Sequence, residues 1–256
     1  MGMTEREAIL EAGLSARGKM FLMAGTTTPS LRDTIHLTRR AFEQGVDAAV
    51  VLPPYYYKKV TEQGLLEFYR DLFDEAVPND GMVLLYHIPQ ITQIPISFDL
   101  LEQLVEISSK RLMGVKDSSG DPDHSRQLCA HFPELRIFVG TDKLLLDGLK
   151  FGAAGCITAG ANVLAPLAVS VYRKFCSGKP AGDIQAKLSA AREVLEDHQP
   201  FPATLKSLLL RRYGGESWNV RPPLVPLSSR QSEELYIQLQ ALDLAGTLPW
   251  LFEDHP

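Results

Sequence analysis

Short apolar runs alternate with longer amphipathic segments along the first two thirds of the chain. The apolar runs are almost unbroken, which is typical of parallel strands with both faces buried. Each run is followed by a segment with apolar residues at helical spacing. The pattern predicts six strands, at Phe21–Ala24, Ala48–Leu52, Met82–Tyr86, Leu112–Val115, Arg136–Val139 and Gly155–Thr158. Strands that alternate with helices at this interval indicate βαβ units, a parallel sheet and an α/β fold.

After Pro166 the pattern predicts helices only. Their expected ranges are Leu167–Phe175, Asp183–Asp197, Pro202–Tyr213 and Arg230–Leu244. No stretch rich in glycine and serine separates this part from the strands. We therefore expect an α/β domain over residues 1–164 and a helical C-terminal extension over residues 165–256.

The composition excludes several classes of protein. Of the 256 residues, 45% are hydrophobic and 22% charged, which excludes an intrinsically disordered chain. The net charge is −5, and lysines and arginines gather no further than in pairs, which argues against a nucleic-acid partner. No apolar run approaches the roughly 20 residues that cross a bilayer, so no membrane partner is expected. Early glutamates argue against a secretory signal.

Cysteines and histidines give no sign of a metal or redox centre. Cys129, Cys156 and Cys176 cannot all pair and have no CxxC spacing, so we interpret them as buried, reduced thiols of a cytoplasmic protein. The six histidines show no zinc-binding spacing. The chain also has no dinucleotide-binding, P-loop or serine-hydrolase motif, so we expect neither a metal nor a redox cofactor.

Functional groups in parallel α/β folds lie at the carboxyl ends of strands, where two candidates stand. Alternation along a strand places Lys116 on the face of Leu112 and opposite to Asp117. An enclosed neutral lysine is a nucleophile toward a carbonyl, and the alternative is a lysine that exits to solvent. The Tyr86 phenol either shuttles a proton or packs with its hydroxyl bonded to the backbone. His87 points the other way and is interpreted as structural.

Loops after other strands carry further polar and aromatic groups. Tyr55-Tyr56-Tyr57 follows the second strand and indicates a subunit contact or a pocket wall, with ordinary aromatic packing as the alternative. Thr26-Thr27-Thr28 and Gly140-Thr141-Asp142 offer hydroxyl and N–H groups. Such groups either hold a carboxylate or serve only as turns and caps.

Four of these segments, taken in order, resemble the motifs of a known family. Tyr86-His87-Ile88-Pro89 resembles the Y-x-[IV]-P motif of the dihydrodipicolinate synthase / N-acetylneuraminate lyase family. Residues 114–120, Gly-Val-Lys-Asp-Ser-Ser-Gly, resemble its Schiff-base segment. Pro54-Tyr55-Tyr56 is similar to its P-Y-Y loop, and Gly155-Cys156-Ile157-Thr158 with Ala161-Asn162 to its G-x-I-[ST]…A-N segment.

The resemblance implies the (β/α)8 TIM-barrel fold, with residues 1–164 as the barrel portion and residues 165–256 packed on the barrel. It also implies a class I (Schiff-base) aldolase or lyase. Such an enzyme breaks or forms a carbon–carbon bond in a 2-oxo acid, with pyruvate as product or donor. Lys116 is then the imine-forming residue, Tyr86 relays protons, and Tyr56 enters the proton relay of a neighbouring subunit. The implied pocket residues are Gly140, Thr141 and Ile157. The family needs no metal or organic cofactor and is usually a homotetramer, a dimer of dimers, so we expect this chain to form a homo-oligomer, either a dimer or a tetramer.

The chain departs from the family pattern in three places. The first two family strands, the second of which ends in Gly-Thr-Thr-Gly-Glu, have no counterpart here. Gly25-Thr26-Thr27 aligns with the third strand, so the carboxylate-binding roles are not carried onto it. Ile91 stands where dihydrodipicolinate synthases have a substrate-binding arginine, which argues against that activity; neuraminate lyases have an apolar residue there. His87 stands where asparagine is common.

Two alternatives to a working aldolase stay open. The chain is either a non-catalytic barrel homologue that binds a 2-oxo acid or an N-terminally truncated member of the family. Eight strands close the family's barrel and only six are recognisable here. We therefore expect the barrel to be partly open, completed by a neighbouring subunit, or poorly soluble, because open strand edges pair with other chains.

Overall fold

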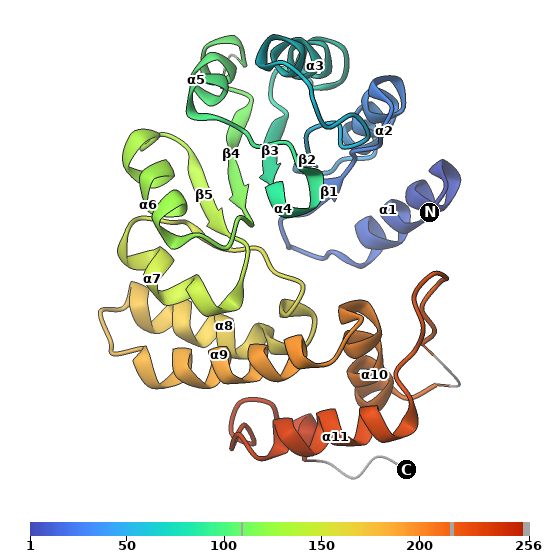
Figure 1. The fold of residues 1–256 in the computed structure, drawn as a ribbon, viewed down its shortest axis with the longest axis vertical. Helices are drawn as coiled ribbons and strands as arrows, with labels where there is room; N and C mark the ends of the chain where they lie inside the picture. Colours follow the sequence, from blue (N-terminus) through green and yellow to red (C-terminus); the bar gives the residue numbers. More distant parts are fainter. Residues whose placement is uncertain (109, 216–217, 253–256) are drawn as a thin grey trace. The chain divides into compact units, whose positions relative to one another are not determined.

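The computed structural model describes residues 1–108, 110–215 and 218–252. Figure 1 labels the α-helices and the strands β1 to β5. The strands are β1 Met23–Gly25, β2 Ala48–Val51, β3 Met82–His87, β4 Leu112–Asp117, β5 Arg136–Val139 and β6 Gly155–Cys156. The α-helices are α1 Met3–Ala16, α2 Leu31–Glu43, α3 Glu62–Ala76, α4 Pro89–Thr92, α5 Phe98–Ile107, α6 Pro122–His131, α7 Leu145–Lys150, α8 Ala161–Cys176, α9 Gly182–Asp197, α10 Phe201–Tyr213 and α11 Ser229–Gln240. Two 3₁₀ helices are η1 Asp142–Leu144 and η2 Pro249–Leu251.

The strands form one sheet whose order follows the chain, from β1 to β6. The pairs β1–β2, β2–β3 and β3–β4 are parallel. Every connection between neighbouring strands contains a helix, as in (β/α) barrels. The predicted α/β fold with six strands is confirmed, and within the described residues no strand follows Cys156.

Capping side chains determine where four of the outer helices begin. Ser30, Thr61 and Ser97 each accept a hydrogen bond from the backbone N–H three residues later, at the starts of α2, α3 and α5. Asp121 does the same for an N–H two residues later, at the start of α6. These bonds satisfy backbone donors that have no partner inside the helix.

Two helices that contain a proline differ from the predicted pattern. α4 is a single turn directly after β3, where no helix was expected, and it starts with Pro89, a residue suited to the first position of a helix. α8 starts at Ala161 and continues through Pro166, whereas the prediction began only after this proline. A proline inside a helix removes a hydrogen bond. Burial of Leu164 and Leu167 on either side of Pro166 outweighs that loss.

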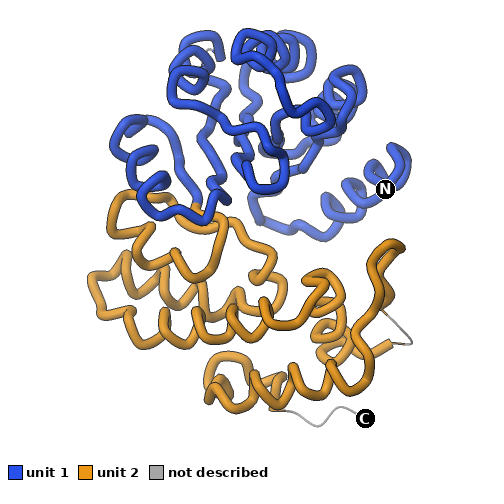
Figure 2. Tube along the Cα trace, viewed as in Figure 1, with its two compact units in different colours: residues 1–138 blue, residues 139–256 orange. Residues whose placement is uncertain are grey.

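The chain divides into two compact units, residues 1–138 and residues 139–256 (Figure 2). In the first unit, alternate strand residues such as Ala49, Val51, Val83 and Leu85 pack against the apolar faces of α3, α5 and α6. In the second unit, helices α7 to α11 and η2 enclose a separate core. The expected boundary between residues 164 and 165 stays a prediction.

The cysteines are all free, and they differ in exposure. Cys129 and Cys156 are half-buried, and burial raises the pKa of the Cys129 thiol to about 11 and that of Cys156 to about 12. Cys176 is exposed, so the prediction of three buried thiols is wrong. It is the last residue of α8, beyond Val171, the last buried residue of that helix.

Within the described residues, no helix combines the length and the apolar character that a bilayer span requires.

Candidate active site

Lys116 and Tyr86 lie opposite each other on neighbouring parallel strands. β3 and β4 pair so that Tyr86 is in register with Lys116. Lys116 Nζ lies 3.8 Å from the centroid of the Tyr86 ring, and both residues are half-buried. An ammonium group is attracted to the electron-rich face of an aromatic ring. The structure therefore brings the two candidates at these strand ends together.

A β-bulge decides which side chains share the face of Lys116. Val83 lies opposite Leu112, but the next residue of β3 lies opposite the residue after Met113, so Met113 is skipped. Simple alternation placed Leu112 on the face of Lys116, and this prediction is wrong. The bulge turns Leu112 towards the core that contains Val83, because the extra residue changes the alternation.

β4 approaches β5 closely at Gly114. A Cβ atom on Gly114 would lie 1.9 Å from the carbonyl oxygen of Arg136 in β5. No side chain fits at that distance, so glycine is required two residues before Lys116. This contact gives a physical reason for the first glycine of the Gly-Val-Lys-Asp-Ser-Ser-Gly segment.

Tyr56 and Ile91 lie on the surface of the first unit. The Tyr56 side chain is 70% exposed, and its ring packs edge-on against Tyr57 with 5.2 Å between the ring centroids. Ile91 in α4 is 67% exposed. Tyr56 and Tyr57 together form an exposed aromatic patch, and such patches mark contact surfaces for other molecules.

The other three candidates belong to the second unit and directly follow the strands β5 and β6. Gly140 and Thr141 follow β5, Ile157 follows β6, and all three are half-buried. The Ile157 N–H donates to the carbonyl of Val139 at 3.0 Å, which holds the two strand ends side by side. Thr141 Oγ1 also caps η1 by accepting from the N–H of Lys143.

The hydroxyls of Thr26, Thr27 and Thr28 are used inside the fold. All three residues are buried. Thr26 Oγ1 accepts from Thr38 Oγ1 at 2.7 Å, and Thr27 Oγ1 accepts from the N–H of Leu52 at 2.7 Å. Thr28 Oγ1 donates to a backbone carbonyl two residues on. These are turn and packing interactions, so this segment is structural.

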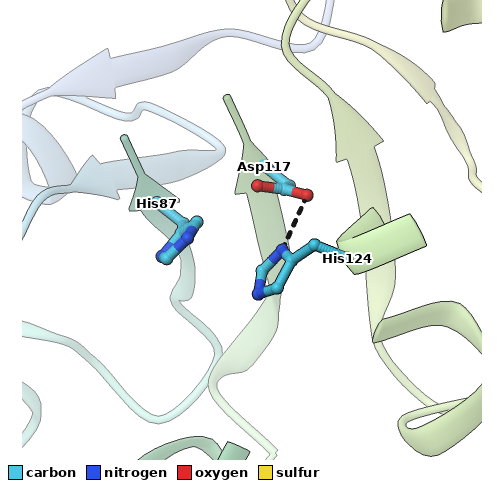
Figure 3. A group of neighbouring side chains, drawn as sticks. All are labelled: His87, Asp117 and His124. Atoms are coloured by element: carbon cyan, nitrogen blue, oxygen red, sulfur yellow. Dashed lines mark hydrogen bonds and ion pairs between the residues drawn. The ribbon is translucent and has the colours of Figure 1, made fainter. Parts of the chain in front are cut away.

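Behind Lys116 and Tyr86, on the other face of the strands, lies a histidine–aspartate cluster of His87, Asp117 and His124 (Figure 3). His87 and Asp117 are in register on β3 and β4, and His124 comes from α6. The His124 Nδ1–H donates to Asp117 Oδ2 at 3.0 Å, and the His87 and His124 rings stack with 4.7 Å between centroids. His87 stood out in the sequence whereas His124 did not, because only packing brings α6 to this place.

The cluster shifts the pKa values of its members in different directions. Burial lowers the pKa of His87 to about 4. The hydrogen bond to Asp117 raises the pKa of His124, despite partial burial. Burial by itself raises the pKa of Asp117, but hydrogen bonds from His124, Ser125 and the N–H of Ser119 outweigh it and hold that pKa below its usual value. At neutral pH the cluster therefore contains a neutral His87 and an ionised Asp117.

Among the described residues, the histidine–aspartate cluster is the group whose potential metal-ligand atoms lie close enough together to hold a metal ion. One ligand atom from each residue lies within 4.8 Å of the others. However, the N–H of Ile96 donates to His87 Nδ1 at 3.1 Å, which leaves the proton of the neutral ring on Nε2 and removes that atom as a ligand. Both Asp117 oxygens already accept hydrogen bonds. The donor set thus fits a hydrogen-bonded structural cluster better than a metal site.

Replacing His87 with asparagine is expected to make folding less sensitive to acid. In the unfolded chain His87 takes up a proton near its ordinary pKa, which lies between pH 7.5 and pH 5. In the folded protein it does so only near its lowered pKa of about 4. The wild type therefore loses about 2 kcal/mol of stability from this residue over that range, and the variant does not. Urea unfolding at several pH values measures the difference.

His131→Asn is the matched control for the His87 variant. His131 is exposed on α6 and pairs with Glu102. Its replacement should leave the acid sensitivity of the wild type in place. Equal losses of stability in the wild type and His87→Asn between pH 7.5 and pH 5 would contradict the prediction.

The chain is similar to known proteins over most of its length. The model of the dihydrodipicolinate synthetase family matches residues 1–242. An uncharacterised DapA-like lyase of Chloroflexus aurantiacus is 40% identical over 249 residues, which cover 97% of this chain and 82% of that protein. A 4-hydroxy-tetrahydrodipicolinate synthase of Anaplasma marginale is 32% identical over 234 residues, covering 90% of this chain and 74% of that protein.

A solved structure has a similar fold. The crystal structure of YagE, a prophage protein of the dihydrodipicolinic acid synthase family from E. coli K12 in complex with pyruvate, superposes with a TM-score of 0.87 and 26% sequence identity. The match covers 95% of this chain and 83% of YagE.

Proposed function

Since the chain belongs to the dihydrodipicolinate synthetase family, we propose that it is a class I aldolase that cleaves or forms a carbon–carbon bond in a 2-oxo acid. Pyruvate is the product or the donor. The observation that carries this proposal is the position of Lys116 Nζ, 3.8 Å from the Tyr86 ring at the carboxyl ends of two paired strands. The pyruvate complex of YagE supports the choice of ligand.

In the proposed mechanism Lys116 forms an imine with the keto carbon of the substrate. The neutral amine attacks this carbon, and the carbonyl oxygen takes up protons and leaves as water. The protonated imine at C2 then accepts the electron pair of the C3–C4 bond as that bond breaks, and the hydroxyl on C4 gives up its proton so that the other fragment leaves as an aldehyde. Protonation of the resulting enamine and addition of water release pyruvate and the free amine. Tyr86 is suited to carry the protons because its ring already contacts the lysine.

We assign the remaining candidates to substrate contacts and to assembly. Gly140, Thr141 and Ile157 line the pocket near the imine. Tyr56 reaches the proton relay of a second subunit, for which its 70% exposure leaves it free. Ile91 replaces a charged contact to the partner aldehyde with an apolar one, and this favours a substrate other than that of dihydrodipicolinate synthases. We further propose a homo-oligomer, a cytoplasmic location, and residues 165–256 as a helical extension of the barrel.

The reaction needs no metal or organic cofactor in this proposal, because the imine itself is the electron sink. The second candidate function is a barrel homologue that binds a 2-oxo acid without turnover. It is favoured by the structural use of the Thr26 and Thr27 hydroxyls, which leaves no Gly-Thr-Thr carboxylate site of the family type in the described residues.

Trapping with borohydride tests the imine directly. Incubation with pyruvate followed by reduction is expected to give a single adduct by intact mass, which peptide mapping locates on Lys116. A folded sample without an adduct, or with the adduct on another lysine, would contradict the proposal. An adduct without pyruvate release from any 2-keto-3-deoxy sugar acid, 4-hydroxy-2-oxoglutarate or N-acetylneuraminate would favour the binding protein instead.

A further inference from the structure

A buried ionic network fastens the ends of β5 and β6 to helix α9. Asp142, directly after Thr141, is fully buried, and its Oδ2 accepts hydrogen bonds from Thr158 Oγ1 at 2.7 Å and from Arg192 Nη1 at 3.0 Å. Arg192 Nη1 also lies 3.0 Å from Thr158 Oγ1, and its Nε donates to Glu196 Oε1 at 2.9 Å. One guanidinium group therefore contacts both strand-end loops.

The geometry of the carboxylate depends on these contacts. Among the described residues Asp142 Oδ1 has no hydrogen-bond partner, so Oδ2 alone orients the group. The backbone of Gly160 packs closely against this carboxylate: a Cβ on Gly160 would lie 2.5 Å from Asp142 Oδ2. The Arg192 side chain is only 14% exposed, and its guanidinium lies 4.4 Å from the centroid of the Phe201 ring. The Phe201 ring thus packs against the guanidinium of Arg192. Among the described residues, Arg192 is the only cation that contacts the buried Asp142 carboxylate.

The same helix makes a second connection two turns earlier. Gln185 Nε2 donates to the backbone carbonyl of Asp142 at 3.0 Å, and Gln185 Oε1 accepts from the N–H of Leu146 at 3.0 Å. Gln185 and Arg192 are seven residues apart and therefore lie on one face of α9. This face of α9 therefore makes hydrogen bonds to the segments that follow β5 and β6.

We infer that Arg192 is a positioning residue for the proposed reaction. Gly140 and Thr141 directly precede Asp142, and Ile157 directly precedes Thr158. By holding Asp142 and Thr158, Arg192 determines where these three pocket residues stand, without touching the substrate itself. The inference rests on the proposed function. It adds that a residue of the C-terminal helices determines how well the barrel loops bind the 2-oxo acid.

The test measures the pyruvate concentration that half-saturates borohydride trapping, counted per folded molecule. Arg192→Met is expected to raise it about tenfold, because loops displaced by a fraction of an ångström lose contacts with the bound acid. Arg192→Lys keeps a cation near Asp142 and should recover part of the loss. Thr158→Val removes only the hydroxyl that bonds Asp142, so it should raise the half-saturating concentration, but by less than Arg192→Met. This smaller change keeps the test informative if the methionine variant does not fold.

Lys187→Met is the matched control on the same helix. Lys187 pairs with Asp243 on an exposed surface, so its loss should leave half-saturation unchanged. A purely structural role for Arg192 predicts lower stability with wild-type half-saturation in every folded variant, and this result would overturn the inference while the proposed function stands. Absence of an adduct in the wild type would overturn both.

Discussion

Replacing Lys116 with alanine is expected to lower pyruvate release from the 2-oxo acid substrate by a factor of about 10³ or more. Without the amine no imine forms, and the breaking carbon–carbon bond has no electron sink. The fold should persist, because the lysine is half-buried at the end of β4 and its contact is with the face of the Tyr86 ring. A coupled assay for pyruvate, together with a thermal melt of each variant, measures both effects.

Two further variants separate imine chemistry from charge. Lys116→Arg keeps a cation that can lie over Tyr86 but cannot form the imine, so it should be as inactive as the alanine variant. Lys110→Gly removes the lysine that precedes Lys116 in the sequence, at a position with φ of 72° that glycine adopts without strain, and activity should stay at the wild-type level. Substantial activity in either Lys116 variant would rule out the Schiff-base mechanism.

Gly114→Ala is expected to destabilise the protein by about 4 kcal/mol or more, a large part of the total stability of an ordinary domain. The new methyl group would stand 1.9 Å from the Arg136 carbonyl oxygen, so β4 and β5 have to separate or the bulge has to rearrange. Urea unfolding monitored by circular dichroism measures the loss. Any variant that still folds should also bind pyruvate more weakly, since Lys116 lies on the displaced strand.

Gly13→Ala provides a control for the glycine change itself. Gly13 lies inside α1, and its added Cβ would meet only a Leu22 methyl group at 4.0 Å. In a helix interior alanine is about 1 kcal/mol more favourable than glycine, so this variant should be as stable as the wild type or slightly more stable. An unchanged unfolding midpoint for Gly114→Ala would show that the strands adjust to the methyl group without cost.

Parts of the candidate site could be predicted because they follow from local rules. Lys116 and Tyr86 were found because apolar runs mark strands, and the residues that end parallel strands meet at one edge of the sheet. The neighbouring Asp117 and His87 were correctly placed on the opposite face, since side chains alternate along a strand. Similarly, the order of strands and helices depends on periodicity within short windows of sequence.

Other parts depended on contacts between distant segments. The alternation failed at Leu112, because a bulge reflects how two strands fit together rather than the residues of one strand. Pro166 did not break α8, because burial of the leucines beside it compensates for the missing hydrogen bond. His124 and Arg192 gave no signal in the sequence, since each gains its role from a carboxylate on another element.

By itself the sequence determined the α/β class, the six strands, the helical last third and the pair of residues at the two central strand ends. These follow from the spacing of apolar residues and from the geometry of single strands and helices. The tertiary structure decided the close approach of β4 and β5 at Gly114, the surroundings of Asp117 and the buried ionic network around Asp142. Steric contact and the burial of charge depend on which segments meet, and that is a property of the folded chain.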